Sequence, residues 1–190
     1  MTLLNPREVH VFVYTYMDGI GAMLGRDLKI AAKDVKCKVE LAKEGLAALD
    51  ARIDARHVVV DCARTGTRDD HSVLSAADHA TINTHIQDDA LNADSFREIH
   101  FASTLVEPHR HGVDITGRLT IKGHTHQVHM KLVRSGDHYA GTVQLRLADY
   151  GIKPFSKWLG LFHIKPEVML EVSLPIDMVA HDYGAAGKPI

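Results

Sequence analysis

The chain has 190 residues, of which 45% are hydrophobic and 24% charged, and 22 basic against 24 acidic residues give it a net charge of −2. This composition is that of an ordinary globular protein with a buried core, and the length is compatible with a single domain. No basic patch or stripe is visible in the sequence, so nucleic acid is not an expected partner.

The N-terminal segment, MTLLNPREVHVFVYTYMDG, has neither the basic start of a signal peptide nor the unbroken apolar run of a membrane-spanning helix. We therefore expect a cytoplasmic protein without a transmembrane segment, or a periplasmic one if this is not the native N-terminus. The two cysteines, Cys37 and Cys62, fall in predicted strands without CxxC spacing. We interpret them as buried, reduced side chains rather than as a disulfide.

Short apolar runs dominate the first third of the chain. Alternating side chains over residues 9–16 predict a first strand with two largely apolar or aromatic faces. Four further runs rich in Val, Ile and Leu follow: Leu28–Ala32, Val35–Leu41, Leu49–Ile53 and His57–Ala63. Regular short strands with turn residues between them are typical of β-sandwiches and barrels.

The next segment changes its period. Ser75 is a good N-cap, and Ile82, Ile86 and Leu91 then recur at nearly helical spacing. We predict one amphipathic helix over residues 75–91. Such a helix can cover one mouth of a barrel, either as a movable cap or as a static plug of the core.

Strands resume after the helix. Ile99, Phe101, Ser103 and Leu105 predict one inward face. The strongest pattern in the chain comes next, where two alternating segments flank Lys122-Gly123 and predict a β-hairpin, because glycine tolerates the positive φ of a tight turn. In that hairpin Ile121 pairs with His124, Leu119 pairs with His126, and His111 falls opposite Arg134.

The last third of the chain contains two more predicted strands, over residues 139–147 and 168–178, with a long aromatic connection between them. In total we count about ten strands and one helix, with mostly neighbour-to-neighbour connections. This order predicts a mainly β fold, a single antiparallel up-and-down β-barrel. The domain would span residues 1–180, and residues 181–190 would form a small polar tail.

Three motifs carry a family resemblance. They are FREIHFAST (Phe96–Thr104), GRLTIKGHTHQV (Gly117–Val128) and LADYGIKP (Leu147–Pro154). Together they resemble the YceI-like family over nearly the whole chain, although Arg26 stands where many relatives have histidine. The resemblance implies a lipocalin-like barrel that binds, sequesters or carries an elongated apolar molecule of the isoprenoid or fatty-acyl type, without a cofactor.

The alternation along each predicted strand shows which side chains point inward. Together with this resemblance it gives a set of candidate ligand-binding residues. They are Val13, Phe101, Ile115, Leu119, Met130, Val143, Leu145, Trp158, Phe162 and Leu170. Trp158 and Phe162 belong to an aromatic segment that either lines the mouth of a pocket or closes the end of a core, with lysines nearby that can meet anionic head groups.

Arg64, Arg68 and Asp69 form a polar cluster between a predicted strand and the predicted helix. One interpretation is a polar mouth that holds a ligand head group through an arginine guanidinium. The other is an ion pair on the surface, where such a pair contributes about 0–1 kcal/mol.

Fourteen histidines raise the question of a metal. The pairs His124/His126 and His109/His111 each share a strand face, but the hairpin register separates them by roughly 30 Å at ~3.3 Å per residue. No HExxH or CxxC spacing is present, and Ser72 beside His71 lacks a GxSxG motif. We therefore predict no metal site and no catalytic residues.

Two alternatives to a carrier remain open. An enzyme acting on a bound apolar substrate needs a polar side chain that points into the barrel, and His126 is the candidate by parity. A barrel filled by its own side chains would instead serve as a structural or partner-binding module. A homodimer formed through an exposed strand or the aromatic segment is compatible with either alternative.

Overall fold

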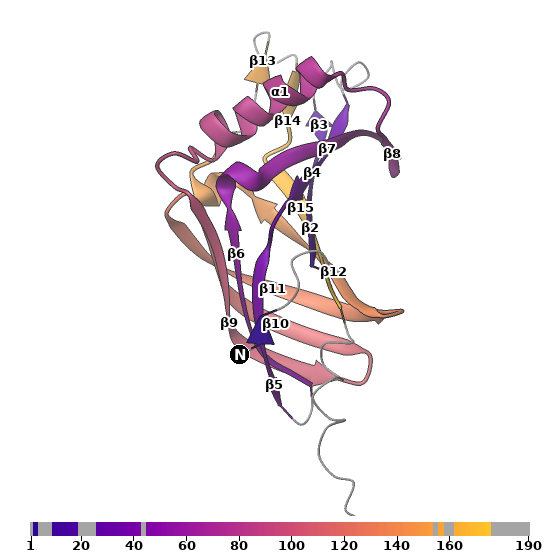
Figure 1. Cartoon of the computed structure of the whole chain (residues 1–190), viewed down its shortest axis with the longest axis vertical. Coiled ribbons are helices and arrows are strands. Elements are labelled where there is room, and N and C mark those ends of the chain that lie inside the picture. Colours follow the sequence, from indigo (N-terminus) through magenta and orange to yellow (C-terminus); the bar gives the residue numbers. More distant parts are fainter. Residues whose placement is uncertain are drawn as a thin grey trace, which may run out of the picture.

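The structure is a computed structural model that describes residues 2–3, 9–18, 26–42, 45–153, 156–157 and 162–175. Most of these residues belong to antiparallel strands, and one long helical segment interrupts the strand order (Figure 1). The predicted mainly β fold with a single helix is therefore confirmed. The predicted tail at 181–190 and Trp158 lie outside the described residues.

The strands are β1 (Thr2–Leu3), β2 (His10–Thr15), β3 (Met17–Asp18), β4 (Asp27–Ala32), β5 (Lys36–Ala42), β6 (Gly45–Asp54), β7 (Val58–Thr65), β8 (Arg68–Asp70), β9 (Glu98–His109), β10 (Gly112–Ile121), β11 (His124–Ser135), β12 (His138–Arg146), β13 (Ser156–Lys157), β14 (Phe162–Ile164) and β15 (Glu167–Pro175). The helical segments are η2 (Ala55–His57), α1 (Ala76–Thr84), the π-helix η3 (His85–Ala90) and η4 (Leu147–Tyr150).

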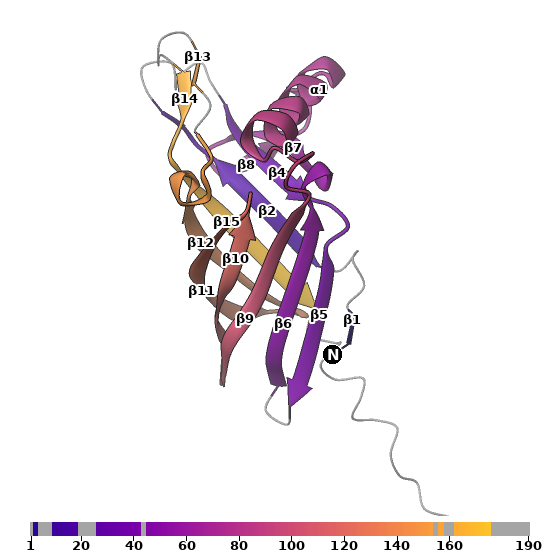
Figure 2. The ribbon, with the colours of Figure 1, turned by 90° about the vertical axis from the view of Figure 1, so that its left-hand side faces the viewer.

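Twelve of the strands form one curled antiparallel sheet in the order β1-β5-β6-β9-β10-β11-β12-β15-β2-β4-β7-β8. The remaining three make a small sheet, β13-β14-β3. Two of its strands, β13 and β14, lie in the segment that the sequence predicts to be a plain connection, and β3 follows β2 near the start of the chain. Figure 2 shows β5, β6 and β9 as one wall of the curl. In the same view α1 and the strands β13 and β14 lie together at the top of the molecule. The large sheet curls because strands twist with a fixed hand.

Two short connections form a corner that joins strands near opposite ends of the large sheet. β4 and β5 are separated by only three residues, 33–35, and β6 runs through η2 into β7. At the corner the Lys33 N–H donates to the His57 carbonyl at 2.8 Å, and the Ala55 N–H donates to the Arg97 carbonyl at 2.8 Å. Two strand pairs, β5 with β6 and β4 with β7, thus belong to one continuous bent ribbon that brings the curl round on itself.

The central hairpin has the register that the sequence predicts. Ile121 pairs with His124 and Leu119 with His126, and the Arg134 N–H donates to the His111 carbonyl at 2.9 Å. The two turn residues, Lys122 and Gly123, have φ values of 52° and 76°. A two-residue turn with two positive φ angles matches the right-handed twist of the strands that it joins.

One predicted strand face is wrong beyond its midpoint. A register shift opposite Thr116 and Gly117 leaves Thr104 as an extra residue of β9, a β-bulge. The bulge exchanges the two faces of the strand, so that Leu105 is 51% exposed and Val106 packs against the core. Leu105 therefore does not continue the inward face of Ile99 and Phe101.

The helical segment begins at the predicted residue. The Ser75 side chain accepts a hydrogen bond from the Asp78 N–H, and Asp78 in turn accepts one from the Ser75 N–H. This capping box starts α1, and η3 prolongs it to Ala90, close to the predicted end at residue 91. Figure 1 shows α1 lying across one end of the curled sheet.

Candidate ligand-binding cavity

A cavity of about 820 Å³ lies inside the curled sheet. Its wall is built mainly from aliphatic side chains on strands from both halves of the chain, including β2, β4, β5, β9, β10, β11 and β15. Strand alternation produces this wall, because every second residue of each strand points to the concave face. Ile115 and Leu132 are fully buried in it.

Seven of the ten candidate ligand-binding residues line this cavity. They are Val13, Phe101, Ile115, Leu119, Met130, Leu145 and Leu170. Val143 is not among the lining residues, although it packs half-buried against the core. Trp158 and the side chain of Phe162 lie outside the described residues.

Arg64, Arg68 and Asp69 do not line the cavity, contrary to the expectation of a polar mouth. The Arg64 guanidinium stacks 4.4 Å from the centroid of the Tyr14 ring. Tyr14 alternates along β2 with the lining residue Val13, so this contact lies on the convex face of the sheet. Arg64 therefore points to the convex face of the sheet, away from any ligand inside the curl.

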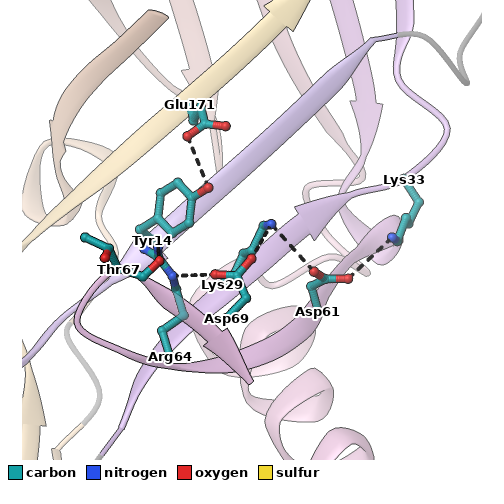
Figure 3. Close-up of polar contacts among 8 residues, drawn as sticks. All are labelled: Tyr14, Lys29, Lys33, Asp61, Arg64, Thr67, Asp69 and Glu171. Carbon is teal, nitrogen blue, oxygen red and sulfur yellow. Dashed lines mark hydrogen bonds and ion pairs between the residues drawn. The ribbon is translucent and has the colours of Figure 1, made fainter. Parts of the chain in front are cut away.

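On that convex face, charged side chains form a continuous network (Figure 3). Arg64 Nε lies 2.7 Å and Lys29 Nζ 2.8 Å from opposite oxygens of Asp69. The hydrogen bonds from Lys29 and Arg64 hold the pKa of Asp69 below its usual value despite partial desolvation. Tyr14 donates its hydroxyl to Glu171 at 3.1 Å, and burial, with help from that carboxylate, raises the pKa of Tyr14 to about 12.

Most of the polar side chains in the cavity wall come instead from the helical segment. Asp78, Thr81, His85 and Asp89 all line the cavity beside Ile82 and Ile86. Their spacing of three, four and four residues places them in one row along the helix. Asp89 is 70% exposed at its side chain, so the row forms the solvated rim of the cavity rather than its floor.

The sequence does not predict this polar row, because only the apolar residues of the helix are expected to face the barrel. The spacing of Asp78, Thr81, His85 and Asp89 was visible in the sequence, but nothing there placed the row beside a cavity. Within it His85 Nδ1 lies 2.6 Å from Asp89 Oδ2. These two residues belong to the π-helix η3, a rare geometry that recurs at functional sites.

His126 is exposed and does not line the cavity, although its position in the strand alternation predicts an inward-pointing side chain. The β11 face that carries it leaves the cavity wall beyond Val128, and its ring packs edge-on against Tyr150 at 5.3 Å between centroids. Tyr150 is buried in the wall, and burial raises its pKa to about 12. Ser72, which is next to His71 in the sequence, donates its hydroxyl to Asp70 at 2.7 Å and not to His71.

Both cysteines are free and buried, as expected. Cys37 lies in the cavity wall, and burial, with a smaller effect from Asp50, raises the pKa of its thiol to about 12. Cys62 is on the convex face with Asp61 and His71, and these three carry the types of donor atom that bind metal ions. None of the described helices has the length and apolar composition that a membrane-spanning helix requires.

Comparison with known proteins agrees with this geometry. The family model described as "YceI-like domain" matches residues 4–177. The crystal structure of BcnA from Burkholderia cenocepacia superposes with a TM-score of 0.65 at 15% identity, covering 90% of this chain and 97% of that one. The YCEI protein of Campylobacter jejuni gives a TM-score of 0.53 at 15% identity, covering 76% and 81% of the two chains. No curated protein sequence matches the chain.

Proposed function

Because the chain belongs to the family of YceI-like domains, which is known for binding polyisoprenoids, we propose that it binds and carries an elongated apolar molecule, an isoprenoid or a fatty-acyl chain, inside the curled sheet. The observation that supports this proposal best is the cavity of about 820 Å³ with its aliphatic wall. Pockets that hold small molecules span about 300–1,000 Å³, so the cavity is large enough for such a ligand.

The binding free energy would come from the burial of apolar surface. A chain that buries about 300 Å² against this wall gains about 7.5 kcal/mol at ~25 cal/mol per Å², before the cost of immobilising the ligand. Few polar contacts are needed for that gain. A wall of this kind favours length and flexibility in the ligand over hydrogen-bonding groups.

The polar row on the helical segment fits the other end of such a molecule. An apolar chain inside the sheet would leave its head group beside Asp78, His85 and Asp89, where water also has access. The helix would then act as the cap over the mouth. This arrangement needs no buried charge, because the polar groups stay at the solvated rim.

Binding is favoured over catalysis by the placement of polar groups. The lining side chains that can transfer a proton lie on the rim or, like Tyr150 and Cys37, have a pKa raised to about 12 by burial. A general acid or base works best with a pKa near the operating pH. A barrel filled by its own side chains is disfavoured by the volume of the cavity.

The first test is native mass spectrometry of the protein purified from its source, followed by extraction and analysis of any apolar molecule. We expect one ligand per chain. A matched pair of variants on β6 tests the location: Ala51→Trp fills the cavity, whereas Ala47→Trp adds the same ring at an exposed position. Loss of ligand in Ala51→Trp alone supports the proposal.

The opposite result is also clear. If the protein carries no apolar molecule and takes up neither added polyisoprenol nor added fatty acid, the carrier function is wrong. Equal uptake by both tryptophan variants and the parent would place the ligand outside the cavity. Circular dichroism of both variants shows whether the fold is retained.

A further inference from the structure

Three potential metal ligands meet on the convex face, away from the cavity. One ligand atom from each of Asp61, Cys62 and His71 lies within 4.8 Å of the other two. Cys62 is buried, Asp61 is half-buried and His71 is exposed. The set therefore sits under the surface with one side open to solvent.

A β-bulge in β7 explains why two adjacent residues share this face. Lys29 pairs with Cys62 and Ile30 pairs with Val60, so that Asp61 has no partner of its own on β4. Successive side chains of a regular strand point to opposite faces, whereas the extra residue of a bulge re-aims its neighbours. Phe12 alternates along β2 with the lining residues Val11 and Val13, so its ring lies on the convex face. The Lys29 ammonium lies 4.2 Å from the centroid of that ring, which places Lys29 on the same face.

The third ligand arrives through the β7–β8 hairpin. β7 and β8 are antiparallel, and Ala63 pairs with Asp70. One step back along β7 is Cys62, and one step forward from Asp70 is His71, so these two residues lie beside each other. A short hairpin and a bulge thus bring a carboxylate, a thiol and an imidazole together from only eleven residues of chain.

The Asp61 carboxylate forms two long ion pairs, with Lys29 and with Lys33. Lys29 and Lys33 both approach the Asp61 carboxylate only to 4.0 Å, which is beyond hydrogen-bonding distance. Lys29 is itself neutralised by Asp69 at 2.8 Å, and this pairing reduces its repulsion of a cation nearby. Cys62 forms no disulfide.

We propose that Asp61, Cys62 and His71 bind a zinc ion. Sulfur, nitrogen and carboxylate oxygen are the usual zinc ligands, at about 2.3, 2.0–2.1 and 2.0–2.2 Å. A tetrahedral ion holds such atoms about 3.5 Å apart, so separations of up to 4.8 Å must shorten by up to about 1.3 Å. His71 lies in an exposed turn that can make this movement, and the fourth coordination position is left to water.

The experiment is a titration of the full chain with Co²⁺, followed by displacement with Zn²⁺. We expect one Co²⁺ per chain with a thiolate-to-cobalt charge-transfer band, and the loss of that band when Zn²⁺ is added. His71→Gln, at an exposed position, should keep the fold and weaken binding by more than about 100-fold. Cys62→Ser should abolish the band.

Two controls separate this site from other metal-binding groups. The double variant His124→Gln/His126→Gln removes an exposed histidine pair, and Cys37→Ser removes the other thiol. Both should retain the parent spectrum. A cobalt complex without a thiolate band, or one that survives His71→Gln and disappears in the double variant, would overturn the proposal. Failure here leaves the carrier function untouched, because the cluster does not line the cavity.

Discussion

The side-chain oxygen of Asn83 accepts a hydrogen bond from the backbone N–H of Val60 at 2.8 Å. Asn83 belongs to α1 and Val60 to β7, so this bond fastens the helix to a strand of the curled sheet. One turn further on, Gln87 Nε2 donates to the Arg56 carbonyl at 2.8 Å. Asn83 thus satisfies a backbone group on an edge of β7 that would otherwise be open to pairing with another chain, and Gln87 satisfies a carbonyl of η2.

Asn83→Ala should loosen this attachment. The half-buried N–H of Val60 would lose its acceptor, and such a loss costs about 1–3 kcal/mol. We expect a lower midpoint of urea unfolding and faster hydrogen exchange at the Val60 amide. Asn83→Asp keeps an acceptor oxygen and is the matched control. If the helix is a movable cap, Asn83→Ala also releases a bound apolar ligand faster. Unchanged exchange at Val60 would contradict the assigned bond.

Gly117→Ala should destabilise the cavity wall. A Cβ atom at this position would collide with the Phe101 ring and lie 2.7 Å from the Ala102 carbonyl oxygen. Overpacking of this kind costs about 1–3 kcal/mol. Phe101→Leu removes the ring but not the carbonyl, so the double variant should recover part of the loss. A double-mutant cycle in urea measures the coupling, and strictly additive effects would count against the contact.

The stability of the corner should depend on pH through Asp54. The Arg56 N–H, followed by the Arg97 guanidinium, holds the pKa of Asp54 below its usual value. A lowered folded-state pKa stabilises the protein above the unfolded value of about 3.9, and this contribution is lost as the pH falls through the folded pKa. Asp54→Asn removes the titration while keeping an acceptor for Arg56.

We therefore expect Asp54→Asn to be less stable than the parent at pH 7, by less than about 1 kcal/mol because the pair is partly exposed. The difference should shrink as the pH is lowered below 4. Asp88→Asn, at an exposed position on η3, provides the control for loss of one charge. A difference that grows toward low pH would contradict the sign. The measurement is the free energy of unfolding in urea at several pH values.

The thiol of Cys37 should be almost inert in the folded protein. With its pKa raised to about 12 by burial, its thiolate fraction at pH 8 is far below that of a free cysteine, and its side chain is shielded from solvent. We expect a charged thiol reagent to modify Cys37 more than about 100-fold slower than a model thiol, and rapidly after unfolding. Cys37→Ser identifies its share of the reaction. Rapid labelling of the native parent, absent in Cys37→Ser, would show that solvent reaches the wall.

Much of the fold was predictable where local pattern and turn chemistry agree. Alternation on both sides of Lys122-Gly123 gave the hairpin register to the residue, and Ser75 marked the start of the helix. The bulges at Thr104 and Asp61 were not predictable in the same way. A bulge is defined by two residues facing one on the partner strand, and the sequence of one strand alone does not show it.

The candidate site divides along the same line. The alternation of side chains along the strands predicted seven lining residues correctly. Each of them lies on a strand whose inward face continues onto the neighbouring strands. The position of Arg64 between a strand and a helix predicts a residue at the mouth of the cavity. Its real direction depends on its contact with Tyr14, which is 50 positions away in the chain. The row from Asp78 to Asp89 was missed because the rotation of a helix about its axis is set by what it packs against.

The pairing of β2 with β15 has a consequence for synthesis of the protein. The hydrogen bond from Tyr14 to Glu171 spans 157 positions, and β2 pairs with β15 on one side from His10 to Tyr14. While the chain grows on a ribosome, β2 and its apolar side chains must wait for almost every later residue before that edge can pair. We expect the hairpins from β9 to β12 to form first and the β2–β15 seam to close last, so the nascent chain passes through a stage at which it needs protection from aggregation.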